Sequence, residues 1–151
     1  MLKTISVIFI IIFSLSACKP KVDKMPQLNK PQCLTSQSVC VIKTTMGKFT
    51  VGFNVAEVKV ETPFSIIVSY TGKQKIETIN GYMEGKNMFM GKIPLLFKNN
   101  LNNNRFIAGT MVVACSEPKM TWRVWIKAKY QSENLQKEMV QGFFVDFTSS
   151  Y

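Results

Sequence analysis

The segment that decides the fold class lies at residues 121–130 and has the sequence TWRVWIKAKY. Apolar side chains occupy every second position, and basic residues or tryptophan stand between them. Successive side chains of a β-strand point to opposite faces of the sheet, so this alternation predicts a strand with one buried face. The side chains predicted to face one way are Trp122, Val124, Ile126, Ala128 and Tyr130, and those predicted to face the other are Arg123, Trp125, Lys127 and Lys129.

Other short segments of strand character precede and follow this one. They are rich in β-branched or aromatic residues, and turn residues separate them about every ten positions. They lie at residues 39–44, 49–53, 55–61, 64–70, 76–83, 93–97, 105–114 and 139–147. Residues 131–137 are polar and have room for a helical turn, but no long segment has helical periodicity. The pattern predicts an all-β domain, an antiparallel sandwich of seven to nine strands.

Three local features refine this prediction. Pro94 cannot donate to a strand ladder, so the strand at residues 93–97 is expected at a sheet edge. Residues 98–104 have the sequence KNNLNNN, which predicts a turn-rich connector. Gly109, inside the predicted strand at residues 105–114, is a candidate for a β-bulge.

The N-terminus carries the features of a secretory signal peptide at residues 1–17. Lys3 supplies positive charge, and an apolar run at residues 5–15 leads to the sequence LSAC at residues 15–18. That ending resembles the lipobox of bacterial lipoproteins, and the resemblance implies that Cys18 becomes a lipidated mature N-terminus. The alternative is an uncleaved signal-anchor helix, but the apolar run is shorter than the ~20 residues that span a bilayer.

Residues 18–32 are predicted to form a lipidated, flexible tether ahead of a single domain at residues 33–151. The tether holds four lysines and three prolines and has few apolar residues. Its positive charge favours an anionic membrane surface. Lys19 stands where lipoproteins retained at the inner membrane carry an aspartate after the lipidated cysteine. We therefore expect a lipid-anchored, periplasm-facing protein, with the outer membrane as the preferred location.

Charge and composition exclude several classes of function. The formal net charge is +10, and removal of the signal peptide leaves 18 basic and 9 acidic residues. Nucleic acid is not an expected partner, because an exported protein meets little of it and no binding motif occurs. The chain contains no histidine, which removes the usual general base of Ser-His-Asp and Cys-His catalysis. The carboxylates show no convergent pair, so we do not expect an enzyme.

Two segments are rich in sulfur: residues 81–91 have the sequence GYMEGKNMFMG, and residues 115–122 are CSEPKMTW. In an extended segment Met88 and Met90 would point to one side and Phe89 into the core. Thioether and thiolate sulfur prefer Cu(I) to hard cations, so the two segments predict a Cu(I) site if they meet at one end of the sandwich. The alternative is that the methionines fill gaps in the core. The candidate ligands are Met88, Met90, Cys115 and Met120, and Trp122 is a candidate for a cation–π contact with the ion.

The cysteines that follow Cys18 are odd in number. Cys33 and Cys40 flank a small polar loop, and we expect a disulfide between them that leaves Cys115 as a free thiol. The competing pairing joins Cys40 to Cys115 and would link the two sheets. A free Cys115 is either an inert, buried thiol or a thiolate metal ligand.

These residues resemble the FixH/YtkA-like group of small envelope proteins. The resemblance rests on Met88-Phe89-Met90-Gly91, Pro94, Cys115, Met120-Thr121-Trp122 and the Cys33…Cys40 pair ahead of the first strand. It spans roughly residues 33–130 and implies an immunoglobulin-like, membrane-tethered sandwich associated with copper handling and cytochrome oxidase assembly. By position it implies that Met88, Met90, Cys115 and Met120 hold the metal. Because histidine is absent, Cu(I) and not Cu(II) is the expected ion.

Two hypotheses of different classes follow from the sequence. In the first, the protein is a lipid-anchored envelope protein that binds or transfers Cu(I), with an envelope or oxidase-assembly protein as its partner. In the second, it is a non-catalytic interaction or structural lipoprotein that binds no metal. Affinity for Cu(I) distinguishes the two hypotheses.

Overall fold

The computed structural model describes residues 39–100, 104–131 and 139–151. The predicted signal peptide, the tether, the lipidation site at Cys18 and the cysteine at position 33 lie outside these ranges. Within the described ranges, no helix is long and apolar enough to cross a membrane.

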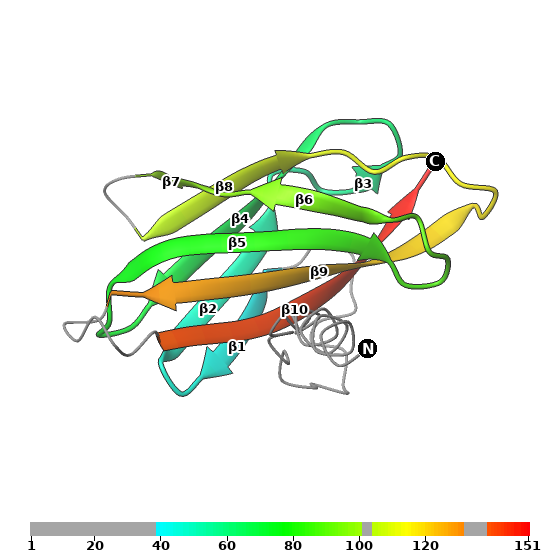
Figure 1. Ribbon diagram of the computed structural model, residues 1–151. Helices are drawn as coiled ribbons and strands as arrows, with labels where there is room; N and C mark the ends of the chain where they lie inside the picture. Colours follow the sequence, from blue (N-terminus) through cyan, green and yellow to red (C-terminus); the bar gives the residue numbers. More distant parts are fainter. Residues whose placement is uncertain (1–38, 101–103, 132–138) are drawn as a thin grey trace, which may run out of the picture.

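The described chain forms two five-stranded sheets that pack face to face (Figure 1). Sheet I has the order β1 (Cys40–Thr44), β2 (Gly47–Phe53), β4 (Phe64–Thr71), β8 (Arg105–Thr110) and β7 (Lys98–Asn100). Sheet II has the order β3 (Val58–Lys59), β10 (Met139–Ser150), β9 (Lys119–Tyr130), β5 (Ile76–Gly85) and β6 (Lys92–Leu96).

The all-β sandwich predicted from the sequence is confirmed, with two corrections. The described residues form ten strands, not seven to nine. The sandwich is also not wholly antiparallel, because β3 runs parallel to β10 in the register Ser149↔Val58.

The core lies between the two sheets and is built from alternate positions of their strands. Along β9 the inward residues are buried and the outward residues are partly exposed at every step, as the sequence predicted. Facing aromatic side chains join the sheets, and the ring centroids of Phe49 on β2 and Phe143 on β10 lie 4.6 Å apart. Rings this close add a favourable term of about 1 kcal/mol to the burial of their apolar surface.

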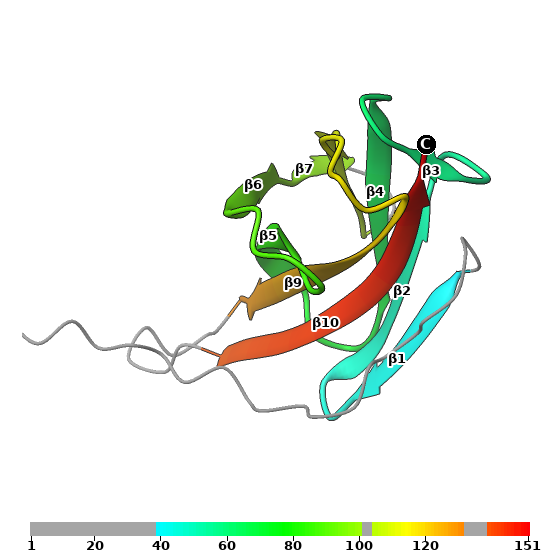
Figure 2. The same cartoon turned by 90° about the vertical axis from the view of Figure 1, so that its right-hand side faces the viewer.

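One long side of the sandwich is closed by the chain itself. β6 and β7 belong to different sheets, yet only Phe97 separates them, so the chain crosses from sheet II to sheet I there (Figure 2). Pro94 lies on β6, which pairs only with β5 among the described strands, so the predicted edge position is confirmed. The connector predicted at residues 98–104 is wrong in part, because Lys98–Asn100 stays extended after the crossing and pairs with β8.

The strand predicted at residues 55–61 is reduced to the two residues of β3. This segment crosses between the sheets, since the N–H of Val60 donates to Ser150 O at 3.0 Å and that of Glu61 donates to Val112 O at 2.8 Å. Val58 is the fully buried residue along it, Val55 and Val60 pack against the core only in part, and Glu61 has a positive φ of 56°. The alternation at residues 55–61 therefore belongs to a segment that crosses between the sheets. Its residues do not all pair with the same neighbouring strand.

The β-bulge predicted at Gly109 is absent, and the predicted strand at residues 105–114 ends at Thr110. Gly109 pairs with Ser65 in an unbroken register between β4 and β8. The register shift in the described sheets lies instead between Ile76 and Thr78 on β5. No atom lies within 4 Å of the position that a Cβ would take at Gly109, so packing does not require glycine there.

Candidate metal centre

The two sulfur-rich loops lie at the same end of the sandwich. Residues 86–91 connect β5 to β6, and residues 111–118 connect β8 to β9; both emerge at the right-hand end of Figure 1, beside the C-terminus. The N–H of Lys86 donates to Thr121 O at 2.9 Å, so the start of the first loop is tied to β9. Because β5 and β9 are neighbours in sheet II, the two loops are held side by side.

Gly85, the last residue of β5, lets the first loop fold tightly against β9. A Cβ at this position would lie 2.2 Å from Met88 O, 3.0 Å from Met120 Cε and 3.4 Å from Met90 Cγ. Only glycine leaves room for such an approach. The candidate ligands Met90 and Met120 therefore both reach the same glycine, beneath the loop that carries Met88.

The sulfur atoms of Met88 and Cys115 are in direct contact. The Cys115 thiol donates to the Met88 thioether, and Sγ and Sδ are 3.3 Å apart. Ser116 Oγ lies 3.9 Å from the same Sγ. The hydroxyl of Tyr151 donates to the carbonyl oxygen of Cys115, so the C-terminal residue holds the second loop in place.

The four candidate ligands differ in their exposure. Met88 is 38% exposed, and Cys115 and Met90 are half-buried. Met120 is only 2% exposed and belongs to the core, so its thioether lies beneath the other three. Met120 thus fills space in the core, as the alternative expectation holds, whereas Met88 does not.

The geometry of the sulfur pair can be compared with that of a metal–thiolate bond. With metal–sulfur bonds of about 2.3 Å, as in zinc thiolates, two ligands at a trigonal angle would have their sulfurs about 4.0 Å apart. The observed 3.3 Å separation falls short of this by about 0.7 Å, a change that side-chain rotation in two surface loops can supply. Among the described residues, no group of three His, Cys, Asp or Glu side chains is placed to hold a metal ion, so a site here depends on methionine sulfur.

Comparisons with known proteins bear on the fold of this chain. No protein-family model matches it, and no curated protein matches it. Among solved structures, it is similar to a DUF4785 family protein from Legionella pneumophila subsp. pneumophila strain Philadelphia 1, with a TM-score of 0.52 and 12% identity. The match covers 70% of this chain and 29% of that chain. This chain therefore matches less than a third of the length of that protein, and the likeness supports the β-sandwich alone.

Two expectations about aromatic residues near the sulfur atoms have different outcomes. The prediction that Phe89 points into the core is wrong, because its side chain is 79% exposed: the chain bends at residues 86–88, and residues 86–91 are a loop and not an extended strand. Trp122 is fully buried, and its indole N–H donates to Ser149 Oγ at 3.0 Å. Its contact with a bound cation remains a prediction.

The described cysteines are in two different states. Cys40 is buried and disulfide-bonded, and Cys115 is a free thiol. The competing pairing of Cys40 with Cys115 is therefore not made. The predicted partner, Cys33, lies outside the described residues, so the pairing of Cys33 with Cys40 stays a prediction.

An ion-pair network that sequence reasoning missed anchors the first loop from its other side. Asp146 on β10 accepts from Arg123 Nε at 2.7 Å and Nη2 at 2.9 Å, and Lys86 Nζ lies 3.2 Å from the same carboxylate. The hydrogen bonds that Arg123 donates to Asp146 raise the pKa of Arg123, against the opposing effect of its partial burial. The alternation at residues 121–130 predicts Arg123 on the outer face of the sheet. It does not predict that Asp146 is the residue that Arg123 contacts.

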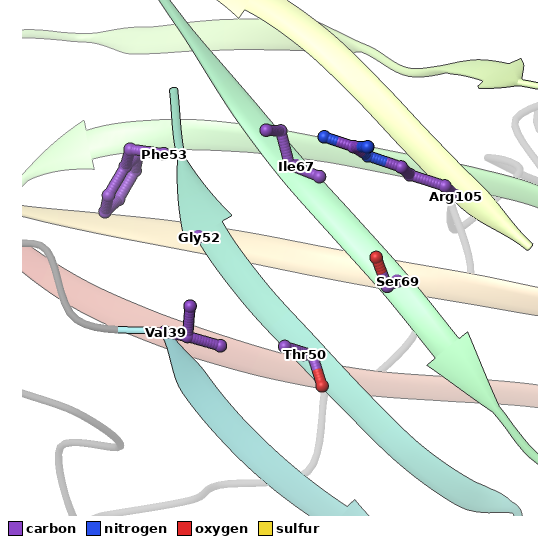
Figure 3. A pocket seen from close by; sticks show the side chains of 7 residues that line it. All are labelled: Val39, Thr50, Gly52, Phe53, Ile67, Ser69 and Arg105. Carbon is purple, nitrogen blue, oxygen red and sulfur yellow. The ribbon is translucent and has the colours of Figure 1, made fainter. Parts of the chain in front are cut away.

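The outer face of sheet I carries a shallow hollow with different chemistry. Its volume is about 240 Å³, and Figure 3 shows its lining from three strands and the residue before β1. The lining residues are Val39, Thr50, Gly52, Phe53, Ile67, Ser69 and Arg105. None of these side chains contributes sulfur or a carboxylate, so the hollow adds no ligand for a soft metal ion.

Proposed function

We propose that this protein is a lipid-anchored envelope protein that binds Cu(I) and passes it on without catalysing a reaction. The observation that carries the proposal is the 3.3 Å contact between Met88 Sδ and Cys115 Sγ, from residues far apart in the sequence. Met88 and Cys115 are the primary ligands in this proposal, and Met90 and Met120 complete a sulfur environment around the same loop.

The donor set favours Cu(I) over other ions. Thiolate and thioether sulfur are soft ligands that suit Cu(I), whereas Ca²⁺ and Mg²⁺ prefer oxygen. A structural zinc site is usually tetrahedral with cysteine and histidine ligands, and the chain has no histidine to supply them. Cys115 is the free thiol among the described residues, which leaves the thioethers to provide the other bonds.

The exposure of the ligands fits transfer better than permanent storage. Met88 is 38% exposed and Cys115 is half-buried, so an incoming ligand from another protein can reach the ion. A site with few ligands also keeps a position open for that incoming group, as open metal sites do in other proteins. An envelope copper protein or an oxidase-assembly protein is the partner that this chemistry suggests.

The N-terminal sequence supports an envelope location for this activity. The LSAC sequence at residues 15–18 would place lipid on Cys18, and multiple acyl chains give stable membrane anchoring. The basic tether at residues 18–32 would be attracted to anionic lipid headgroups. A tethered domain searches a small volume, which raises its effective concentration at a membrane-bound partner.

Titration of the full-length chain with Cu(I) against a competing chelator tests the proposal. The Cys115→Ser and Met88→Ala variants should each bind at least about tenfold more weakly, since loss of one direct ligand typically costs more than 1.4 kcal/mol. Met111→Ala is the matched control, because Met111 is 42% exposed in the loop that carries Cys115, is not a proposed ligand, and should leave affinity unchanged. A Met88→Ala/Met90→Ala double variant that binds as tightly as the parent protein would contradict the proposal.

The alternative function is an interaction or structural lipoprotein without metal. One observation favours it: Phe89 is 79% exposed at the tip of the first loop, beside the partly exposed Met88. Exposed aromatic and methionine side chains are enriched at protein interfaces. This alternative predicts a protein partner that is lost on Phe89→Ala substitution and whose binding is indifferent to Cu(I).

A further inference from the structure

The outer face of sheet I carries charge of one sign. Its five strands contain no aspartate or glutamate. Their exposed cations are Lys43 on β1, Lys48 on β2, Arg105 on β8 and Lys98 on β7. None of the four forms an ion pair with a carboxylate among the described residues. Sheet II differs, because its strands carry three carboxylates, and two of them, Glu77 and Asp146, are in ion pairs.

The four cations are spread over the full width of sheet I. Lys43 and Lys48 are directly opposite each other in the register of β1 and β2, at one edge. Arg105 lies across β4 from them, opposite Ser69, and Lys98 lies on β7 at the other edge. Neighbouring strands are about 4.8 Å apart, so the two outer strands of a five-stranded sheet are separated by roughly 19 Å. One small anion cannot reach charges so far apart, whereas a surface with many separate negative charges can.

Small side chains keep the middle of this face open. In one row across the sheet, Thr50 pairs with Ser69, and Ser69 pairs with Arg105. Figure 3 shows the Arg105 side chain extended from β8 toward Ile67 on β4, where both residues line the hollow of about 240 Å³. A second hollow, of about 390 Å³, is lined by residues of β6, β7 and β8. A broad partner can therefore approach the strands closely.

Exposed aliphatic side chains border the same face at both edges. Val39 and Val41 are 61% and 51% exposed at the β1 edge, and Leu96 is 79% exposed where it lines the second hollow. No aromatic side chain is exposed on the five strands of sheet I, although aromatic residues are enriched at protein interfaces. Surfaces that bind a membrane combine apolar side chains, which enter the boundary between headgroups and acyl chains, with basic residues attracted to anionic lipids. The face therefore resembles a membrane-binding surface more than a protein interface.

The described chain also begins at this face. Val39 is its first residue, and its side chain lines the first hollow (Figure 3). The predicted tether at residues 18–32 precedes it in the sequence. An anchored chain would therefore enter the domain beside β1, the strand that carries Lys43.

We propose that the outer face of sheet I binds an anionic membrane surface. The four cations would contact lipid phosphates, and the exposed valines and Leu96 would enter the boundary between headgroups and acyl chains. Negative headgroups would also relieve the repulsion between Lys43 and Lys48, since like charges directly opposite each other destabilise a sheet. The inference rests on the anchored location proposed above and not on Cu(I) binding. The sulfur-rich loops lie at the end of the sandwich, so a domain that lies on this face keeps its metal ligands open to a partner (Figure 1).

Acetylation of lysines in the full-length chain, followed by mass spectrometry, tests this proposal. Vesicles of phosphatidylglycerol and phosphatidylcholine in equal parts are the anionic probe, and vesicles of phosphatidylcholine alone are the zwitterionic control. Lys43, Lys48 and Lys98 should react at least about threefold more slowly on the anionic vesicles. Lys92 and Lys119, which are exposed on strands of sheet II, should react at equal rates on both. Salt at about 1 M should abolish the difference, because it shortens the Debye length to about 3 Å.

Two double variants that remove equal charge separate the effect of this face from that of the net charge. Lys43→Gln/Lys48→Gln removes two charges from the face, so the slowing at Lys98 on anionic vesicles should be lost. Lys92→Gln/Lys119→Gln removes two charges from sheet II, so the slowing at Lys98 should persist. The apolar run at residues 5–15 is common to all variants, so its own attachment to vesicles does not affect the comparison.

Three results would overturn the proposal. Equal slowing of the lysines of both sheets would mean a general attraction of a basic chain to the vesicles. Unchanged rates at Lys43, Lys48 and Lys98 on anionic vesicles would mean that the face does not meet the membrane. Slowing by soluble polyglutamate that is as strong as the slowing by vesicles would assign the face to an acidic protein instead of lipid. Each of these results leaves the Cu(I) proposal untouched, because the assay measures neither the metal nor its ligands.

Discussion

Substitution of Gly85 by alanine should disturb the sulfur site through backbone packing alone. The new Cβ would lie 2.2 Å from Met88 O, a backbone atom that cannot rotate away. Non-bonded atoms need about 3.5 Å, so the loop must move by about 1 Å. Overpacking of this kind costs about 1–3 kcal/mol, and the reduced entropy of the unfolded chain returns about 0.4–1 kcal/mol. We expect a net loss of about 1–2 kcal/mol in the free energy of unfolding, and weaker Cu(I) binding because Met88 is pushed from Cys115.

Gly109→Ala is the matched control for that substitution. Gly109 lies in β8 with no atom within 4 Å of its would-be Cβ, so this variant should be as stable as the parent or up to about 1 kcal/mol more stable. Urea denaturation measures both variants, and Cu(I) titration follows on the folded proteins. If Gly85→Ala were as stable as Gly109→Ala and bound Cu(I) equally well, the close packing of the loop on β9 would not position the ligands.

Further predictions concern the buried groups and the thiol. Burial raises the pKa of Tyr130 to about 12, and its hydroxyl is buried without a hydrogen-bond partner in the described structure. Its unfolded pKa is about 10, so stability should fall as the pH rises from about 10 to 12, and Tyr130→Phe should flatten this fall in pH-dependent urea denaturation. Arg123→Ala leaves the Asp146 carboxylate buried without its main partner and should cost about 3 kcal/mol, whereas Lys86→Ala, at a partly exposed position, should cost less than about 1 kcal/mol in the same assay. Ag(I), a soft ion like Cu(I), should slow the alkylation of Cys115 measured by mass spectrometry, and an unchanged rate would argue against metal binding by this thiol.

The parts of the fold that the sequence predicts well are those in which one strand buries one face. The alternation at residues 121–130 fixed both the strand and its inward residues, because β9 lies between β10 and β5 with one face on the core. The alternation at residues 55–61 misled for a physical reason: the segment leaves one sheet for the other, and its buried residue is Val58. The strand at Lys98–Asn100 could not be foreseen from its asparagines, because it forms only where the crossing chain meets β8.

The candidate site was predictable in composition and not in geometry. Methionine and cysteine at the ends of predicted strands indicated the two loops, and both lie at one end of the sandwich. The contact between Met88 and Cys115 depends on the adjacency of β5 and β9, which no local pattern encodes. The chain bends at residues 86–88 just before the exposed Phe89, and the sequence gives little sign of a bend in a segment with strand-like alternation.

X-ray absorption spectroscopy of the Cu(I)-loaded chain tests the central claim most directly, because it identifies the atoms bonded to the metal. A sulfur-only first shell at about 2.3 Å is predicted, and it should lose scatterers when Met88 or Cys115 is replaced and keep them when Met111 is replaced. A first shell of oxygen or nitrogen, or a sulfur shell unchanged by both replacements, would contradict the assignment of the ion to the contact between Met88 and Cys115.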